Sequence, residues 1–235
     1  MLNKLRLLGI GKTFFLAGTF LLASAPFISS IFFLLSLAIS FCIGLPRICQ
    51  DKWNYPLAII SFIMVVVAII HNVYYVDIET EIKEKIFSWN PSASWIGLAN
   101  WLPLFLIFMG FQAFLSNKKD RKVCAQYLVA GSLPVLVTGF GQYFFEWYGP
   151  FQTFNKLVVW FQYPLEEGQG LEGLFSNQNY AGCWLNIIWP FSISFLFDKS
   201  LNIFKKSFSV FLIISFSVAI FLTSSRSALG GLLLT

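Results

Sequence analysis

Two short polar segments of this apolar chain hold the residue types that could do chemistry. Residues 168–182 read GQGLEGLFSNQNYAG and lie just before a long apolar run. Residues 223–227 read TSSRS and place a single arginine inside another apolar stretch. Glycines let the backbone come close to a ligand, and Asn177 and Asn179 are placed to cap the following helix. An exposed helix N-terminus suits a phosphate or carboxylate. The alternative is a turn that only leads into a helix.

The composition is that of a membrane protein. Hydrophobic residues make up 57% of the chain and charged residues 11%, and the mean hydropathy is +0.72. A soluble domain needs more charge to cover its surface, whereas a protein in a bilayer does not. The four cysteines show no CxxC or histidine-paired spacing, so neither a metal site, a redox motif nor a cofactor is indicated. The net charge of +5 is interpreted as membrane topology rather than as a nucleic-acid surface.

The apolar runs predict an all-α integral membrane protein with about seven transmembrane helices and the start of an eighth. The seven runs are residues 13–29, 31–45, 56–76, 96–115, 124–147, 180–197 and 208–222. The first two predict a helical hairpin that turns near Ser29 and Ser30. A cleaved secretory signal ending at residues 23–25 is the alternative. We expect Pro134 to kink the fifth run. Residues 148–164 carry apolar residues at helical spacing, which predicts one amphipathic helix in the membrane interface.

The charges predict the orientation. If the N-terminus is cytoplasmic, twelve Lys and Arg residues fall on inner segments, and the outer loops hold Lys83, Lys85 and Lys156. The same outer loops hold eight of the eleven acidic residues. This distribution follows the positive-inside rule. It predicts a multi-pass protein of the plasma (inner) membrane, with residues 1–235 forming one polytopic domain.

Arg226 connects the two polar segments. Phe208 to Arg226 is 18 residues, or about 27 Å of helix, which places Arg226 near the outer edge of a ~30 Å hydrocarbon core. The apolar run continues to Leu234, so a turn is predicted at residues 224–225, with an eighth helix after it. The macrodipole disfavours a cation in a first helical turn, which suggests a bound phosphate as its partner. The alternative is an arginine that reaches up to lipid headgroups. The predicted binding residues are Arg226, Asn177, Asn179, Gly173 and Ser225.

The pairing of GLFSNQNYAG before one span with LTSSRSALGG after the next resembles the O-antigen ligase family, which includes O-antigen polymerase-like members. Those proteins show a G-x-F-x-N-P-N-like motif followed by a T-x-S-R-G-like motif. The resemblance covers about residues 165–235. The family commonly has an arginine shortly before the first motif, which residues 168–172 lack, and Gln178 stands in place of the usual proline.

The resemblance implies a metal-independent membrane glycosyltransferase of lipopolysaccharide or polysaccharide biosynthesis. Such an enzyme moves a glycan from a polyprenyl-pyrophosphate carrier to a saccharide or lipid-linked acceptor on the outer leaflet. Arginine and helix N-termini would stabilise the leaving pyrophosphate. The family associates the general base with a large outer loop further along, so the catalytic residue stays unknown. The chain ends about ten residues after the predicted turn, although a span needs ~20. We therefore expect an N-terminal part of a longer protein, inactive by itself.

Three alternatives remain open. The first is an O-antigen polymerase of the same family. The second is an anion transporter of the bicarbonate type. The predicted spans contain no Asp, Glu, Lys or Arg apart from Glu146 at an outer end, with Arg226 just beyond the last span, and coupled carriers usually need such residues. The third is a structural membrane subunit, in which Arg226 has no chemical role.

Overall fold

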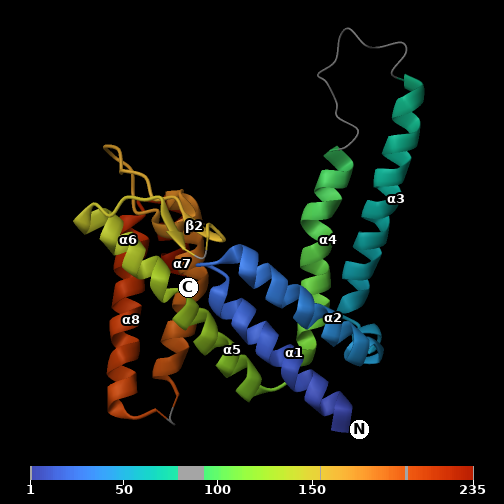
Figure 1. Ribbon diagram of the computed structural model, residues 1–235, viewed down its shortest axis with the longest axis horizontal. Coiled ribbons are helices and arrows are strands. Elements are labelled where there is room, and N and C mark those ends of the chain that lie inside the picture. Colours follow the sequence, from blue (N-terminus) through green and yellow to red (C-terminus); the bar gives the residue numbers. More distant parts are fainter. Residues whose placement is uncertain (1, 79–92, 154, 199–200, 235) are drawn as a thin grey trace. The chain divides into compact units, whose positions relative to one another are not determined.

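The computed structural model describes residues 2–78, 93–153, 155–198 and 201–234, and the side chains of residues 2–4, 44–47 and 71–78 are not among those it describes. Most described residues are helical (Figure 1). The helices are α1 (Leu2–Leu21), α2 (Pro26–Gln50), α3 (Asn54–Ile78), α4 (Ala93–Phe111), α5 (Lys118–Gly131), α6 (Leu133–Phe145), α7 (Gln178–Leu196), α8 (Ile203–Leu222) and α9 (Arg226–Leu234), with 3-10 turns η1 (Gln112–Phe114) and η2 (Gly173–Phe175). Lys83 and Lys85, expected on the outer side, lie outside the described residues.

Four helical segments in the described part of the chain are long and apolar enough to cross a membrane. They are Pro26–Ile43, Ala93–Phe114, Lys118–Phe145 and Ile203–Leu222, and Asn54–Ile70 is a shorter apolar helix. A helical membrane protein is therefore supported. The expected count of seven spans goes beyond these four.

The first helical hairpin turns earlier than its sequence pattern predicts. The turn lies at residues 22–25, and Pro26 begins α2. Proline suits the first helical position because its missing N–H would be unpaired there in any case. Ser29 and Ser30, where the turn was expected, lie inside α2, and the Ser29 hydroxyl donates to the Gly18 carbonyl oxygen at 2.8 Å. The prediction was wrong because serines within an apolar helix can satisfy their hydroxyls on backbone carbonyls.

The fifth predicted span is interrupted at Ser132, between α5 and α6. Pro134 lies in the first turn of α6, where its ring is tolerated and the helix before it ends. Ser132 is buried, and its hydroxyl oxygen accepts the indole N–H of Trp184 from α7 at 3.0 Å. The predicted kink is confirmed.

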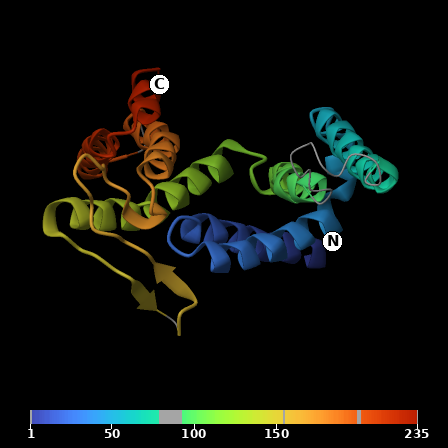
Figure 2. The same cartoon turned by 90° about the horizontal axis from the view of Figure 1, so that it is seen from above.

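Residues 148–164 do not form the predicted interfacial helix. They contain a β-hairpin of β1 (Phe151–Thr153) and β2 (Val158–Trp160), paired antiparallel. The Gly149 N–H extends the pairing by donating to the Gln162 carbonyl at 2.8 Å. The prediction was wrong because tertiary contacts decide such short segments. Val158 is buried, and the Trp160 indole donates to the Ser24 carbonyl at 2.6 Å. Figure 2 shows the hairpin projecting away from α6 and α7.

The chain divides into two compact units, one of residues 1–11 and 36–116 and one of residues 12–35 and 117–235. In the first unit, small residues bring helices together. The Ser36 hydroxyl donates to the Gly11 carbonyl at 2.9 Å, and the side-chain amides of Asn54 and Gln112 exchange two hydrogen bonds of 3.1 and 3.0 Å. Paired amides satisfy polar groups that an apolar environment would otherwise leave unbonded.

The second unit holds both polar segments. Its core consists of apolar residues from α5 to α9 together with Leu171 from the loop before α7 and Ala23 from the turn after α1. Leu171, Leu185 and Phe216 are fully buried. The Trp189 indole of α7 donates to the Ser217 hydroxyl of α8 at 2.8 Å. This core gives the loop before α7 a fixed support.

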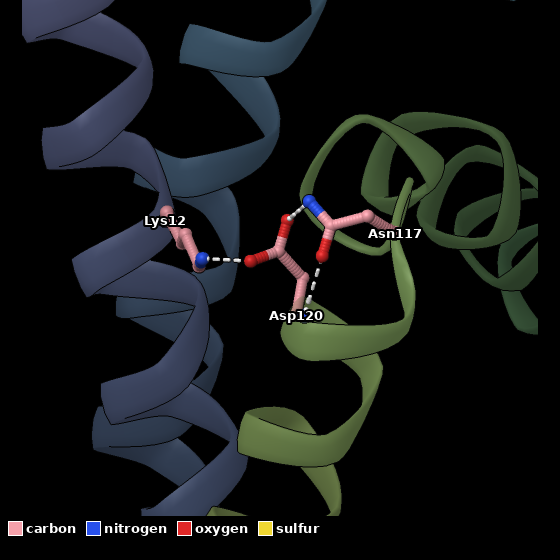
Figure 3. Close-up of polar contacts among 3 residues, drawn as sticks. All are labelled: Lys12, Asn117 and Asp120. Atoms are coloured by element: carbon pink, nitrogen blue, oxygen red, sulfur yellow. Dashed lines mark hydrogen bonds and ion pairs between the residues drawn. The ribbon is translucent and has the colours of Figure 1, made fainter.

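Two ion pairs of the second unit lie at one end of its helices, here called the basic end. Lys12 of α1 pairs with Asp120, and Lys122 pairs with Asp198 beyond α7. Asp120 also accepts the Asn117 amide at 2.7 Å, and its N–H donates to the Asn117 side chain at 2.8 Å, which caps α5 (Figure 3). The β-hairpin lies near the N-terminal end of α7, away from the basic end (Figure 1). The second unit thus has chemically different ends.

Candidate functional site

The loop before α7 is fastened to the end of α8 through its backbone. The Leu171 N–H donates to the Leu222 carbonyl at 2.8 Å. The Gly170 N–H donates to the Gln178 side-chain oxygen at 2.6 Å. A Cβ atom at Gly170 would lie 2.0 Å from the Thr223 carbonyl oxygen, so only glycine fits this approach. Gln178 therefore holds the loop in place through this hydrogen bond.

Gln142 of α6 holds the next part of the same loop. Its side-chain oxygen accepts the N–H groups of Glu172 at 3.1 Å and Gly173 at 2.8 Å. Its amide nitrogen donates to the Tyr163 carbonyl at 3.0 Å. Gly173 has φ of +57°, which glycine adopts without strain. Because its N–H is already bonded, Gly173 contributes shape rather than a free donor. Sequence reasoning missed Gln142, and its only signal was a glutamine inside an apolar run.

The first turn of α7 is capped by Asn177. The Asn177 side-chain oxygen accepts the N–H groups of Asn179 at 2.8 Å and Tyr180 at 3.3 Å, as an N-cap residue does. Asn179 has a different role. Its side-chain oxygen accepts the Ser225 hydroxyl at 2.8 Å, and this bond joins the start of α7 to the start of α9.

The turn predicted at residues 224–225 is confirmed. Ser224 has φ of +53°, and α9 begins at Arg226. Ser225 caps α9, since its hydroxyl accepts the Ala228 N–H at 3.4 Å and its carbonyl accepts the Leu229 N–H at 3.0 Å. Ser225 is buried, whereas Arg226 and Ser227 are exposed.

Arg226 begins α9 and is exposed. In the described part of the chain, its guanidinium makes no ion pair or hydrogen bond. The backbone N–H groups of Arg226 and Ser227 likewise have no partner among the described residues. Free N–H groups at a helix start, beside a planar cation and hydroxyl groups, are typical of phosphate binding. The structure thus brings Asn179, Ser225 and Arg226 together, with Asn177 supporting α7 and Gly173 shaping the loop.

The loop before α7 also forms a pocket of ≈ 480 Å³. It is lined by Tyr163, Pro164, Leu165, Glu166, Gln169, Glu172 and Ser176. Its charged residues are both acidic, so it differs in sign from the surroundings of Arg226. Partial burial raises the pKa of the Glu172 carboxyl above its ordinary value, because desolvation disfavours the charged form. Ser176 and Asn179 are three residues apart, so the pocket and the cationic site flank the same helix start.

Comparison with protein-family models, with curated proteins and with solved structures finds no match to this chain.

Proposed function

We propose that this chain belongs to a membrane glycosyltransferase that moves a glycan from a polyprenyl-pyrophosphate carrier to a saccharide or lipid-linked acceptor on the outer leaflet. The observation that carries the proposal is the junction of the α7 and α9 starts. The Ser225–Asn179 hydrogen bond places Arg226, without an acidic partner among the described residues, beside two free N–H groups. A pyrophosphate leaving group gains negative charge as its bond to the sugar breaks, and fixed donors stabilise that charge.

In this proposal the anion is the pyrophosphate of the polyprenyl carrier, as the resemblance to the O-antigen ligase family implies. The structure supports it through the second motif, which forms the turn and the start of α9. It also supports a rigid first motif, since Leu171 is buried in the core and Gln142 binds the loop. Rigid placement suits a site that must stabilise charge without reorganising.

The orientation of the chain belongs to the same proposal: the N-terminus is cytoplasmic, seven helices cross the inner membrane and an eighth begins at α9. Lys12 and Lys122 at the basic end support it, because basic residues are retained on the cytoplasmic side. Glu166 and Glu172 lie in the loop before α7, at the opposite end of the second unit. The anion site then faces the outer leaflet, where the carrier presents its glycan.

Cysteine labelling tests this orientation. Glu167 and Ser116 are both exposed, so Glu167→Cys and Ser116→Cys are introduced singly into a variant without the four native cysteines. A membrane-impermeant thiol reagent applied to intact cells is expected to label position 167 and not position 116. After the membrane is permeabilised, both positions should react. Labelling of intact cells at 116 alone would place the anion site on the inner side and contradict the proposal.

Removing the protein from its own cells tests the function. Cells that lack it are expected to lose a glycan from its acceptor and to accumulate the same glycan on polyprenyl pyrophosphate. Lipid extraction followed by mass spectrometry measures both pools. Re-expressing the wild-type protein should restore both pools to their original levels. Expressing the Arg226→Ala variant should restore neither. Unchanged pools in the deleted cells would contradict a transferase function.

A further inference from the structure

The pocket in the loop before α7 differs chemically from the surroundings of Arg226. Its lining includes Tyr163, Gln169, Ser176 and the two acidic residues Glu166 and Glu172. Its volume of ≈ 480 Å³ lies in the range of small-molecule sites, which is roughly 300–1,000 Å³. Two carboxylates without a cation repel a phosphate. The lining suits a neutral molecule rich in hydroxyl groups, such as a sugar.

Hydrogen bonds hold the lining in place and leave the carboxylate of Glu172 available. The Gln169 side-chain oxygen accepts the Glu166 N–H at 3.0 Å, which turns its amide group into a fixed part of the wall. The Ser176 hydroxyl donates to the Phe161 carbonyl at 2.6 Å. Glu172 is anchored by its backbone N–H on Gln142, while its carboxylate makes no hydrogen bond or ion pair among the described residues. A carboxylate fixed by its backbone and free at its oxygens is available to a ligand.

The position of the pocket relates it to the anion site. Ser176 belongs to the lining, and the following residue caps α7. One turn later Asn179 binds Ser225, next to Arg226. An acceptor in the pocket and a donor pyrophosphate at Arg226 would therefore both lie near the start of α7. Transfer between two bound substrates requires such neighbouring sites.

We propose that this pocket binds the acceptor sugar and that Glu172 is the catalytic base that takes the proton of its attacking hydroxyl. The inference rests on the proposed transferase function, and it departs from the resembled family, which associates the general base with a large outer loop further along the sequence. In the step, the acceptor oxygen forms a bond to the anomeric carbon of the donor glycan. The bond from that carbon to the pyrophosphate oxygen breaks, and polyprenyl pyrophosphate leaves with the electron pair. The hydroxyl proton passes to the Glu172 carboxylate.

The burial of Glu172 suits this role. Its raised pKa makes the carboxylate a stronger base than an exposed glutamate, and general bases work best when their pKa approaches the working pH. Glu166 and Glu167 of the same loop are exposed. Glu167 does not line the pocket, so it provides a matched control.

Two variants and two measurements test the inference in the full-length protein in its membranes. Glu172→Gln keeps the size of the side chain and its backbone anchor, so it should leave the thermal midpoint unchanged while slowing glycan transfer roughly 100-fold or more. Glu167→Gln should transfer at the wild-type rate. Binding of glycan-free polyprenyl pyrophosphate, followed by tryptophan fluorescence of the purified protein, should be unchanged in Glu172→Gln and lost in Arg226→Ala.

The outcomes separate this inference from the proposed function. Wild-type transfer by Glu172→Gln, together with inactive Arg226→Ala, would overturn the base and leave the transferase standing. The absence of transfer by the wild-type protein would overturn both. Transfer that EDTA abolishes and Mg²⁺ restores would overturn the base in favour of a cation held by the two carboxylates. The inference is supported if Glu172→Gln transfers glycan slowly but still binds polyprenyl pyrophosphate, and if transfer by the wild-type protein is insensitive to EDTA.

Discussion

Replacing Arg226 with alanine is expected to reduce glycan transfer by roughly 100-fold or more, the size of effect that follows loss of one fixed donor to a developing negative charge. Arg226 is exposed, so its removal should not disturb the core or lower stability. Arg226→Lys should be nearly as damaging, because an ammonium group cannot make the two parallel hydrogen bonds of a guanidinium. Transfer measured on membranes containing the full-length variants decides the matter.

Lys156 provides the matched control for this prediction. It is another exposed cation, and it lies in the β-hairpin outside the anion site. Lys156→Ala should transfer at the wild-type rate and bind polyprenyl pyrophosphate normally. If Arg226→Ala is as active as Lys156→Ala, Arg226 interacts only with lipid headgroups and the anion site proposed here is wrong.

The parts of the fold that the sequence predicts correctly are those with a single strong physical cause. The turn before Arg226 was expected because one helix from residue 208 onward would be too long for a bilayer, and Ser224 has the backbone conformation of a turn. The break near Pro134 follows from the missing N–H of proline. In both places chain length or covalent structure leaves few alternatives.

The β-hairpin was missed because its causes are not local. Helical spacing of apolar residues in a short segment also fits a strand whose partners lie elsewhere. Here the Trp160 indole donates to Ser24, 136 residues away, and Val158 is buried. The early turn at residues 22–25 belongs to the same class, since Ser29 is satisfied by the Gly18 carbonyl of the preceding helix.

The candidate site shows the same division. Asn177 was expected as a cap from its type and position, and it is the cap. Asn179 was expected to share that role, but its side chain binds Ser225, which lies 46 residues away. Gln142 and the pocket that contains Glu172 depend on tertiary folding, because Gln142 meets Gly173 only after α6 and the loop have packed together. Residue types thus indicated the chemistry, and long-range contacts determined which atoms remain free for it.

Substituting Gly170 with alanine is expected to inactivate the protein although Gly170 contacts neither proposed substrate. The added Cβ would lie 2.0 Å from the Thr223 carbonyl oxygen and 2.8 Å from the Leu222 carbonyl oxygen. These are backbone atoms, so no side-chain rotation relieves the overlap. The loop must move away from the end of α8, which breaks the hydrogen bond from the Leu171 N–H to Leu222 and pulls Leu171 from the core. Overpacking of this kind costs about 1–3 kcal/mol.

The control for Gly170 is Gly230 of α9, where an added Cβ meets nothing within 4 Å. Gly230→Ala should be neutral or slightly stabilising, because alanine favours helix more than glycine by about 1 kcal/mol. The thermal midpoint in detergent and the transfer rate on membranes are measured for both variants. Gly170→Ala should lower both, since it displaces the loop that carries Glu172 and leads to Asn177. Wild-type values for Gly170→Ala would mean that the loop does not need its close contact with Thr223 to form the site.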